Sequence, residues 1–252
     1  GQQALEDRAS KRETVAVKAK YTIPVEEVIK RYQAWQTAQD FGLDNYTAKA
    51  TVHYLWGIGA GTGSINVTFV NNFFFARKGG ATWEQTQMLV EGLPWTGRDI
   101  PELPIPQPEK VNTVPLDISF GKQYAYTLAG EDIVSGRKAW KVRFKPLDSA
   151  QALYDGHFWV DEESGARLKV SAVQTGLKPP MLTNDETTEY GPMPAPDGGQ
   201  LWVMRKISGQ QTFSAAGFTL KAQRTVEFEN LSLNPPDYAA RLAQAETGDN
   251  HM

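Results

Sequence analysis

The chain has 252 residues, a formal net charge of −3 and no cysteine. The near-neutral charge argues against a nucleic-acid partner or an anionic membrane held by bulk electrostatics. The lack of cysteine excludes disulfide frameworks, thiol nucleophiles and thiolate metal sites. No apolar run approaches the roughly 18 residues that a membrane-spanning helix needs.

Residues 1–22 are an N-terminal extension in our interpretation. They begin GQQALEDRASKRET and contain no apolar segment of the kind found in a signal peptide. We therefore treat them as the mature end that remains after a signal peptide is removed.

A helix is predicted over residues 24–40, PVEEVIKRYQAWQTAQD. Pro24 and the two glutamates that follow it suit a helix start, because a fixed φ and negative charge are both favourable there. Gly42 is a plausible end. The apolar residues recur at i, i+3, i+4, i+7 and i+10, which predicts one buried stripe: Val25, Val28, Ile29, Tyr32 and Trp35.

After this helix the apolar residues recur at every second position, which is typical of antiparallel strands with one buried face. Two turns agree with this pattern: Ser135-Gly136 is a two-residue hairpin loop, and Gly165 suits a left-handed turn position. We therefore expect one sheet of about 9–11 strands, and a sheet of that size curls. The segments that show the alternation are 48–56, 65–69, 82–91, 124–128, 140–144, 158–160, 168–172, 200–207 and 218–229.

Three segments interrupt the alternation. Residues 92–117 contain five prolines before Pro115, which excludes a central strand and predicts a long excursion, or lid, across one rim of the sheet. Residues 178–186 and 191–200 are predicted to be two further breaks. The Gly-rich segment 57–64 lacks the spacing of a phosphate-binding loop and is expected to be a hairpin loop.

Catalytic motifs are absent from the sequence. His53, His157 and His251 are too few for a rich metal site, and we expect neither a metal nor another cofactor. The acidic turn Asp161, Glu162 and Glu163 could in principle perform glycosidic acid–base chemistry. Turn residues are more often acidic for solubility and local hydrogen bonding, so an enzyme is the weaker alternative.

Seven Trp, nine Tyr and 11 Phe leave two interpretations open. These side chains fill an ordinary core, or they line a pocket large enough for an acyl chain. Burying a 16-carbon chain would contribute on the order of 10 kcal/mol, at about 0.8 kcal/mol per methylene and before ordering costs.

Two neighbouring hairpins carry a family resemblance. GEDIVSGRKAWKV is followed by FWVDEESGARLKV, and the chain later reads FENLSLNPPDY. These segments resemble the periplasmic lipoprotein carrier superfamily (LolA-like, which includes LolB- and RseB-type proteins). The matching positions are Gly130, Glu131, Gly136, Arg137, Trp140, Val142, Trp159, Val160, Asp161, Leu168, Lys169 and Val170.

The resemblance implies a mainly β fold: one curved, unclosed antiparallel half-barrel over residues 23–238, with helices across its concave face and a C-terminal tail over 239–252. It also implies an apolar cavity for acyl chains and a location outside the cytoplasmic membrane. The long 92–117 excursion departs from the family pattern.

Together these observations predict a non-enzymatic, monomeric, exported protein that binds a lipid or an acylated protein, with a membrane-associated protein as a possible partner. A sensor or protein-interaction module on the same fold is the first alternative. The residues expected to line the cavity are aromatic: Trp35, Phe69, Phe73, Phe74, Phe75, Trp83, Trp95, Trp140, Phe144 and Phe158.

Overall fold

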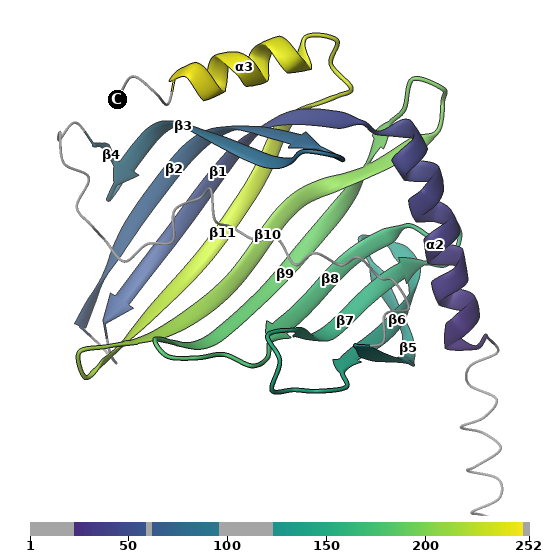
Figure 1. Ribbon diagram of the computed structural model, residues 1–252, viewed down its shortest axis with the longest axis horizontal. Helices are drawn as coiled ribbons and strands as arrows, with labels where there is room; N and C mark the ends of the chain where they lie inside the picture. The colour runs from purple at the N-terminus through teal and green to yellow at the C-terminus, as the bar shows by residue number, and fades with distance from the viewer. Residues whose placement is uncertain (1–22, 59–61, 96–122, 249–252) are drawn as a thin grey trace, which may run out of the picture.

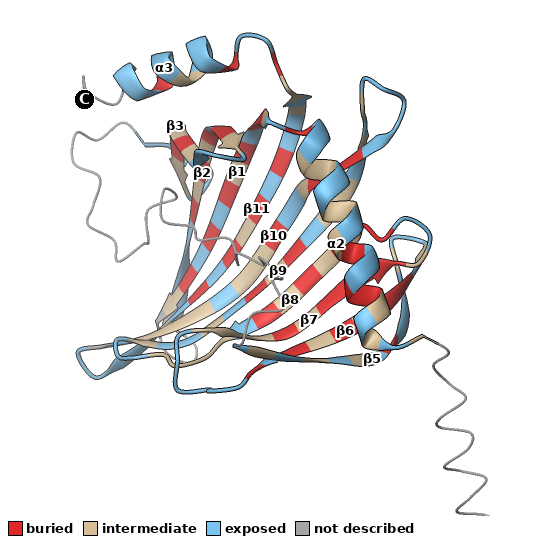
Figure 2. Cartoon of the chain, turned by 45° about the vertical axis from the view of Figure 1, so that its right-hand side comes forward, coloured by how far each residue is buried: buried red, intermediate tan, exposed pale blue. Residues whose placement is uncertain are grey.

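The computed structural model describes residues 23–58, 62–95 and 123–248. Eleven strands form one sheet in the order β4-β3-β2-β1-β11-β10-β9-β8-β7-β6-β5, and neighbouring strands are antiparallel (Figure 1). The first and last strands of this order do not pair with each other, so the sheet is open. It is strongly curved (Figure 2). The predicted unclosed half-barrel is confirmed.

The helices and strands follow one another along the chain as α2 (Val25–Gly42), β1 (Asn45–Ile58), β2 (Thr62–Ala76), β3 (Gly80–Val90), β4 (Leu93–Pro94), β5 (Tyr124–Val134), β6 (Arg137–Pro146), β7 (Tyr154–Asp161), β8 (Arg167–Gln174), β9 (Met181–Pro194), β10 (Gln200–Ala215), β11 (Phe218–Leu233) and α3 (Tyr238–Gly248).

Helix α2 forms where the apolar stripe predicted it. Pro24 precedes the first turn with an extended backbone (φ −73°, ψ 151°), and the first turn carries Glu26 and Glu27. These carboxylates stabilise the helix, because they lie near the positive end of its dipole. The buried residues of the helix are Val28, Ile29 and Tyr32.

The predicted turns also have the expected backbone. Ser135 and Gly136 both have positive φ, 51° and 76°, as a type I′ turn requires between β5 and β6. Gly165 has φ 77°, and a β-carbon there would lie 2.8 Å from the carbonyl oxygen of Arg31. The β7–β8 turn therefore lies directly against α2, and only glycine fits both requirements.

Strand β9 corrects the sequence prediction, which placed breaks at 178–186 and 191–200. Pro192 and Pro194 pair with β10, whereas the pairing of β9 with β8 extends only from Asp185 to Glu189. The last residues of β9 thus have a neighbour on one side only. A proline is tolerated there, because the side of the strand that faces away from β10 has no neighbouring strand to which a backbone N–H would donate.

The side chains of the sheet divide into an inner face, against which α2 packs, and an outer face. Buried residues alternate with more exposed ones along the strands (Figure 2). Two apolar clusters lie on the inner face. The first, the α2 cluster, joins α2 to β5–β8 through Val28, Ile29, Tyr32, Trp140, Val142, Phe144, Phe158, Val160, Val170 and Ala172.

The second inner-face cluster, the β1 cluster, lies on the other half of the sheet. It consists of Leu43 and residues of β1, β2, β3, β10 and β11. Its buried members are Leu43, Tyr46, Ala48, Ala50, Val52, Tyr54, Trp56, Val67, Phe69, Phe73, Trp83, Met88, Leu201, Val203, Ile207, Ala222, Val226 and Phe228.

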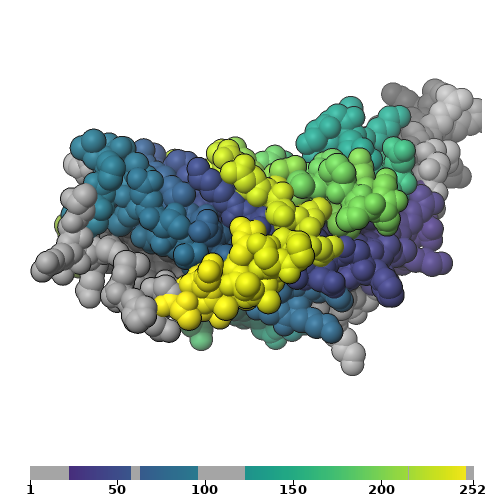
Figure 3. All heavy atoms as spheres, turned by 90° about the horizontal axis from the view of Figure 1, so that it is seen from above, coloured from purple at the N-terminus to yellow at the C-terminus, as the bar shows by residue number. Residues whose placement is uncertain are grey.

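Helix α3 occupies part of the segment that we treated as a C-terminal tail. Viewed from above, it lies across the end of the sheet beside the blue strands β2 and β3 (Figure 3). Its contacts are on the outer face, where Tyr238 and Ala245 pack with Phe74. Leu242 adds a partly buried contact.

Residues 96–117 of the predicted lid lie outside the described residues. The first part of this segment is described: Leu93 and Pro94 pair with β3, and the amide of Trp95 donates to the carbonyl of Met88 at 2.9 Å. The lid over the inner face stays a prediction.

Candidate functional site

The predicted lining residues separate into three groups in space. The first group belongs to the α2 cluster. Phe158 is fully buried, and its ring centroid lies 5.7 Å from that of Tyr32 on α2 and 6.1 Å from that of Phe144. Trp140 is buried in the same cluster, and Trp35 is half-buried against it. These side chains therefore form the packed interface between the helix and the sheet.

The second group belongs to the β1 cluster. Phe73 is its centre, with ring centroids 4.7 Å from Trp83 and 5.0 Å from Phe228. Phe69 is buried nearby, and Phe75 is partly buried with its ring 5.0 Å from that of Tyr46. The cluster is thus an extended buried layer, rich in aromatic residues, on the inner face.

Two predicted residues lie elsewhere. Phe74 points to the outer face, opposite Phe73 and Phe75, because successive side chains of a strand alternate. Its ring lies 6.0 Å from that of Tyr238 on α3, so it does not share the inner surface. Trp95 follows β4 at the sheet edge and keeps 38% of its surface exposed.

The two halves of the inner face differ in their cover. Helix α2 supplies three buried side chains to the α2 cluster. Within the described ranges, no helix contributes a side chain to the β1 cluster, and α3 packs on the opposite face. The two clusters therefore differ in the described elements that pack on them, although the core members of both are at most 8% exposed.

A buried ion pair crosses this inner face. Arg224 on β11 donates from Nη2 to Oε2 of Glu186 on β9 at 2.7 Å, and both side chains are at least 92% buried. The two strands are separated by β10, where Gly209 stands opposite both residues. Because glycine has no side chain, the arginine can reach across β10 to the carboxylate.

Tyr54 completes this polar row from β1, where it lies opposite Arg224. Burial raises the pKa of Tyr54, and the charge of Arg224 and its hydrogen bond to the tyrosine oppose that rise. Sequence reasoning missed the row. Its only sequence signal was Arg224, which interrupts the apolar series of Ala222, Val226 and Phe228.

Among the described residues, three buried polar atoms that we assign to the inner face have no hydrogen-bond partner: Nε1 of Trp56, Oδ1 of Asn71 and Nε of Arg224. Most buried polar groups in proteins are hydrogen-bonded, and leaving one unpaired costs about 1–3 kcal/mol. Ligand sites combine apolar and aromatic side chains with a few placed polar groups, and these three atoms are polar groups of that kind on the inner face.

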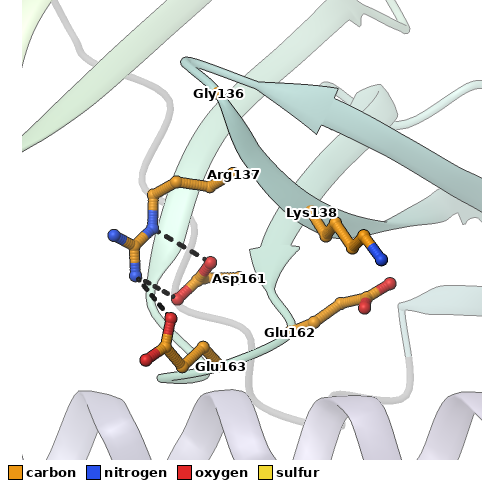
Figure 4. A pocket seen from close by; sticks show the side chains of 6 residues that line it. All are labelled: Gly136, Arg137, Lys138, Asp161, Glu162 and Glu163. Carbon is orange, nitrogen blue, oxygen red and sulfur yellow. Dashed lines mark hydrogen bonds and ion pairs between the residues drawn. The ribbon is translucent and has the colours of Figure 1, made fainter.

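The acidic turn of the sequence analysis lines a separate pocket of about 430 Å³, with Arg137 and Lys138 opposite the carboxylates (Figure 4). Asp161 is 2% exposed and accepts four hydrogen bonds, from Nε and Nη2 of Arg137 and from the amide and hydroxyl of Ser164. Glu163 is 90% exposed, with an oxygen 3.8 Å from Arg137.

The pKa of Asp161 reflects this environment. Burial alone would raise it, but the hydrogen bonds from Arg137 and Ser164, together with the arginine charge, hold the pKa below its ordinary value. A general acid needs a raised pKa, so the geometry favours a structural role for this carboxylate, which joins the β5–β6 hairpin to the β7–β8 turn.

We expect Asp161→Asn to lower the free energy of unfolding at pH 7 by about 2 kcal/mol, since it removes the charge partner of Arg137. A carboxylate with a lowered folded-state pKa stabilises the protein above its unfolded pKa of about 3.9, and this stabilisation is lost as the pH falls through the folded value. Urea denaturation should therefore give a constant difference between the variant and the parent from about pH 5 to pH 8. The difference should shrink at lower pH.

Glu163→Gln is the control, because an exposed charge at 3.8 Å contributes little, and its stability should match that of the parent. Equal losses in both variants would contradict this account of Asp161. A hydrolytic activity that both substitutions abolish without loss of stability would favour the enzyme alternative.

Neither a metal site nor a membrane-spanning helix is found in the described part of the chain. No group of three or more His, Asp or Glu side chains is arranged to hold a metal ion there. The described helices are also too short or too polar to cross a bilayer. His53 is exposed and contacts Thr68.

Comparison with known proteins finds one matching family model and several similar solved structures. The family model of the MucB/RseB N-terminal domain matches residues 98–178, a range that includes both hairpins whose motifs resemble the LolA-like superfamily. The match covers about a third of the chain and agrees with the resemblance that these two hairpins carry. No curated protein matches the chain.

Three solved structures illustrate the similarity. A DUF1329 family protein from Desulfovibrio piger is 15% identical, with a TM-score of 0.43 and 84% of this chain and 94% of that chain covered. A putative outer membrane lipoprotein-sorting protein domain from Vibrio parahaemolyticus is 12% identical, with a TM-score of 0.44 and 86% and 98% covered. A LolA superfamily protein from Nitrosomonas europaea is 10% identical, with a TM-score of 0.34 and 85% and 95% covered.

Proposed function

We propose that this LolA-like chain is an exported, non-enzymatic binding protein that holds a lipid, or the acyl chain of a lipoprotein, against the inner face of its half-barrel. The observation that carries the proposal is the β1 cluster: a buried apolar cluster, rich in aromatic residues, to which no described helix contributes a side chain. In this proposal the protein is a periplasmic monomer.

The energetics suit an acyl ligand. Each buried methylene contributes about 0.8 kcal/mol, so a long chain binds without any directional chemistry. Phe69, Phe73 and Trp83 would supply the contact surface on β2 and β3. The α2 cluster, in contrast, is already packed by the helix and would serve as the rigid half of the scaffold.

The decisive experiment is native mass spectrometry of the protein purified from the envelope fraction of its host, followed by organic extraction. We expect a bound mass that extracts as a lipid. Repeated recovery of a ligand-free protein that also fails to bind a dansyl-labelled undecanoic acid would overturn the proposal.

We expect Trp83→Ala to weaken binding of the dansyl-labelled acid at least tenfold, because it removes a large part of the aromatic surface of the β1 cluster. Trp159→Ala is the matched control. Trp159 is also buried, but it points to the outer face, where the amines of Lys141 and Lys169 lie over its ring.

Fluorescence titration measures both affinities, and the melting temperature of each variant reports folding. Both substitutions should lower the melting temperature, but only Trp83→Ala should weaken binding in the fraction that remains folded. Equal loss of binding in the two variants would place the ligand outside the β1 cluster.

A second candidate function is that of a sensor that binds a partner protein. The match of residues 98–178 to the MucB/RseB N-terminal domain favours it, since the superfamily resemblance includes proteins of this type. Release of a bound partner protein by added lipid, without transfer of lipid between membranes, would distinguish the sensor from the carrier.

A further inference from the structure

Two of the residues that carry these unpaired atoms are diagonal neighbours on the inner face. Trp56 stands opposite Ala222 on β11, and Arg224 is two residues further along the same strand, on the same face. Diagonal neighbours of this kind have β-carbons roughly 7–8 Å apart, which long side chains can span. Asn71 lies opposite Ala50, and Ala50 pairs with Phe228. Phe228 is about 13 Å along β11 from Arg224. One ligand group therefore cannot contact both Asn71 and Arg224.

Both atoms are hydrogen-bond donors in a fixed setting. The indole of Trp56 is held between two rings, with centroids 6.0 Å from Tyr54 and 6.3 Å from Phe213, both nearly parallel to it. Arg224 is held by its ion pair with Glu186. The N–H of Trp56 and the Nε–H of Arg224 therefore have little freedom to find other partners.

The charge of this site is balanced. Glu186 accepts from Nη2 of Arg224 at 2.7 Å, so the carboxylate already neutralises the guanidinium. A second carboxylate at the same place would meet the negative charge of Glu186 at short range. A neutral oxygen acceptor would meet no such repulsion and would satisfy a buried donor.

We propose that Trp56 and Arg224 form a donor site for the ester or amide carbonyl of an acyl lipid, at the boundary between its polar group and its chain. This inference rests on the proposed function and specifies its ligand. The acyl chain lies along the β1 cluster toward Phe73 and Trp83, and the carbonyl lies at the Tyr54–Arg224–Glu186 row.

Competition against the dansyl-labelled undecanoic acid tests the site with three compounds: methyl dodecanoate, the alkane tetradecane of matching chain length, and dodecanoate. We expect methyl dodecanoate to bind about tenfold more tightly than tetradecane, because a tenfold ratio of affinities corresponds to the net contribution of one buried hydrogen bond. Dodecanoate should bind more weakly than its methyl ester.

Trp56→Phe removes the N–H and keeps an aromatic ring in place. We expect it to reduce the preference for the ester over the alkane from about tenfold to about threefold or less. Trp83→Phe is the matched control on the same face. It should weaken the ester and the alkane alike and leave their ratio unchanged.

The joint variant Arg224→Met with Glu186→Gln removes the charge pair together and should also reduce the ratio. Binding of ester and alkane with equal affinity by the parent protein, or an unchanged ratio in Trp56→Phe, would overturn the carbonyl site while leaving the proposed function in place. Failure of all three compounds to displace the probe would overturn the proposed function itself.

Discussion

Gly156→Ala is expected to lower the free energy of unfolding by at least about 3 kcal/mol, a large share of the 5–15 kcal/mol of a typical domain. Gly156 lies on β7 opposite Ala172 of β8. A β-carbon there would lie 2.0 Å from the carbonyl oxygen of Ser171 and 2.7 Å from the Cα of Ala172. The backbones of two interior strands of the sheet would have to separate.

Gly57→Ala is the control for this substitution. Gly57 also lies in a strand, but no atom lies within 4 Å of its added β-carbon and its φ is not positive. Urea denaturation should show a change of less than about 0.5 kcal/mol. A Gly156→Ala protein with the denaturation midpoint of the parent would show that the β7–β8 contact is not as close as described.

Glu186→Gln is expected to cost about 3 kcal/mol, because it leaves the guanidinium of Arg224 buried beside a neutral amide. The pair is nearly inaccessible to water, with 8% and 5% of the two side chains exposed. Replacing both partners, as in Arg224→Met with Glu186→Gln, should recover part of the loss, since the unpaired charge is removed.

A double-mutant cycle in urea measures the coupling between the two residues, with the exposed pair Arg31 and Glu27 as the reference. The Arg31–Glu27 pair is separated by 3.3 Å but keeps 48% and 41% of its side chains exposed, so Glu27→Gln should change stability by less than about 0.5 kcal/mol. Equal effects of Glu186→Gln and Glu27→Gln would contradict the description of a desolvated pair at the polar row.

Much of the architecture could be predicted because it depends on local periodicity. The stripe of α2 required only the 3.6-residue repeat from Val25 to Trp35, and the alternation of Ala48 to Trp56 assigned each side chain of β1 to a face. The Ser135-Gly136 turn followed from the need for positive φ. These features are decided within a few residues, so neighbouring sequence is enough to reveal them.

Other elements were missed although a signal was present. In α3, Tyr238, Leu242 and Ala245 follow helical spacing, but the helix is rich in alanine and lies in a segment that we regarded as a tail. In β9, the prolines suggested a break. They are tolerated because only β10 pairs with that end of the strand, which is a fact of sheet order.

The candidate site was predictable only in part, because it also depends on the order of the strands in the sheet. Parity identified apolar faces but could not show that Phe158 packs under a helix while Phe73 does not. Arg224 and Glu186 are 38 residues apart, and they meet only because β10 brings Gly209 between them.

The amino-acid sequence by itself thus determined most of the strands other than β9, which way their side chains face and where the β5–β6 and β7–β8 hairpins turn, since each depends on short-range sterics and repeat length. The tertiary structure alone decided strand order, register and the position of α2. These properties arise from pairing between distant segments, and they place an aromatic surface and a balanced pair of charges on one inner face.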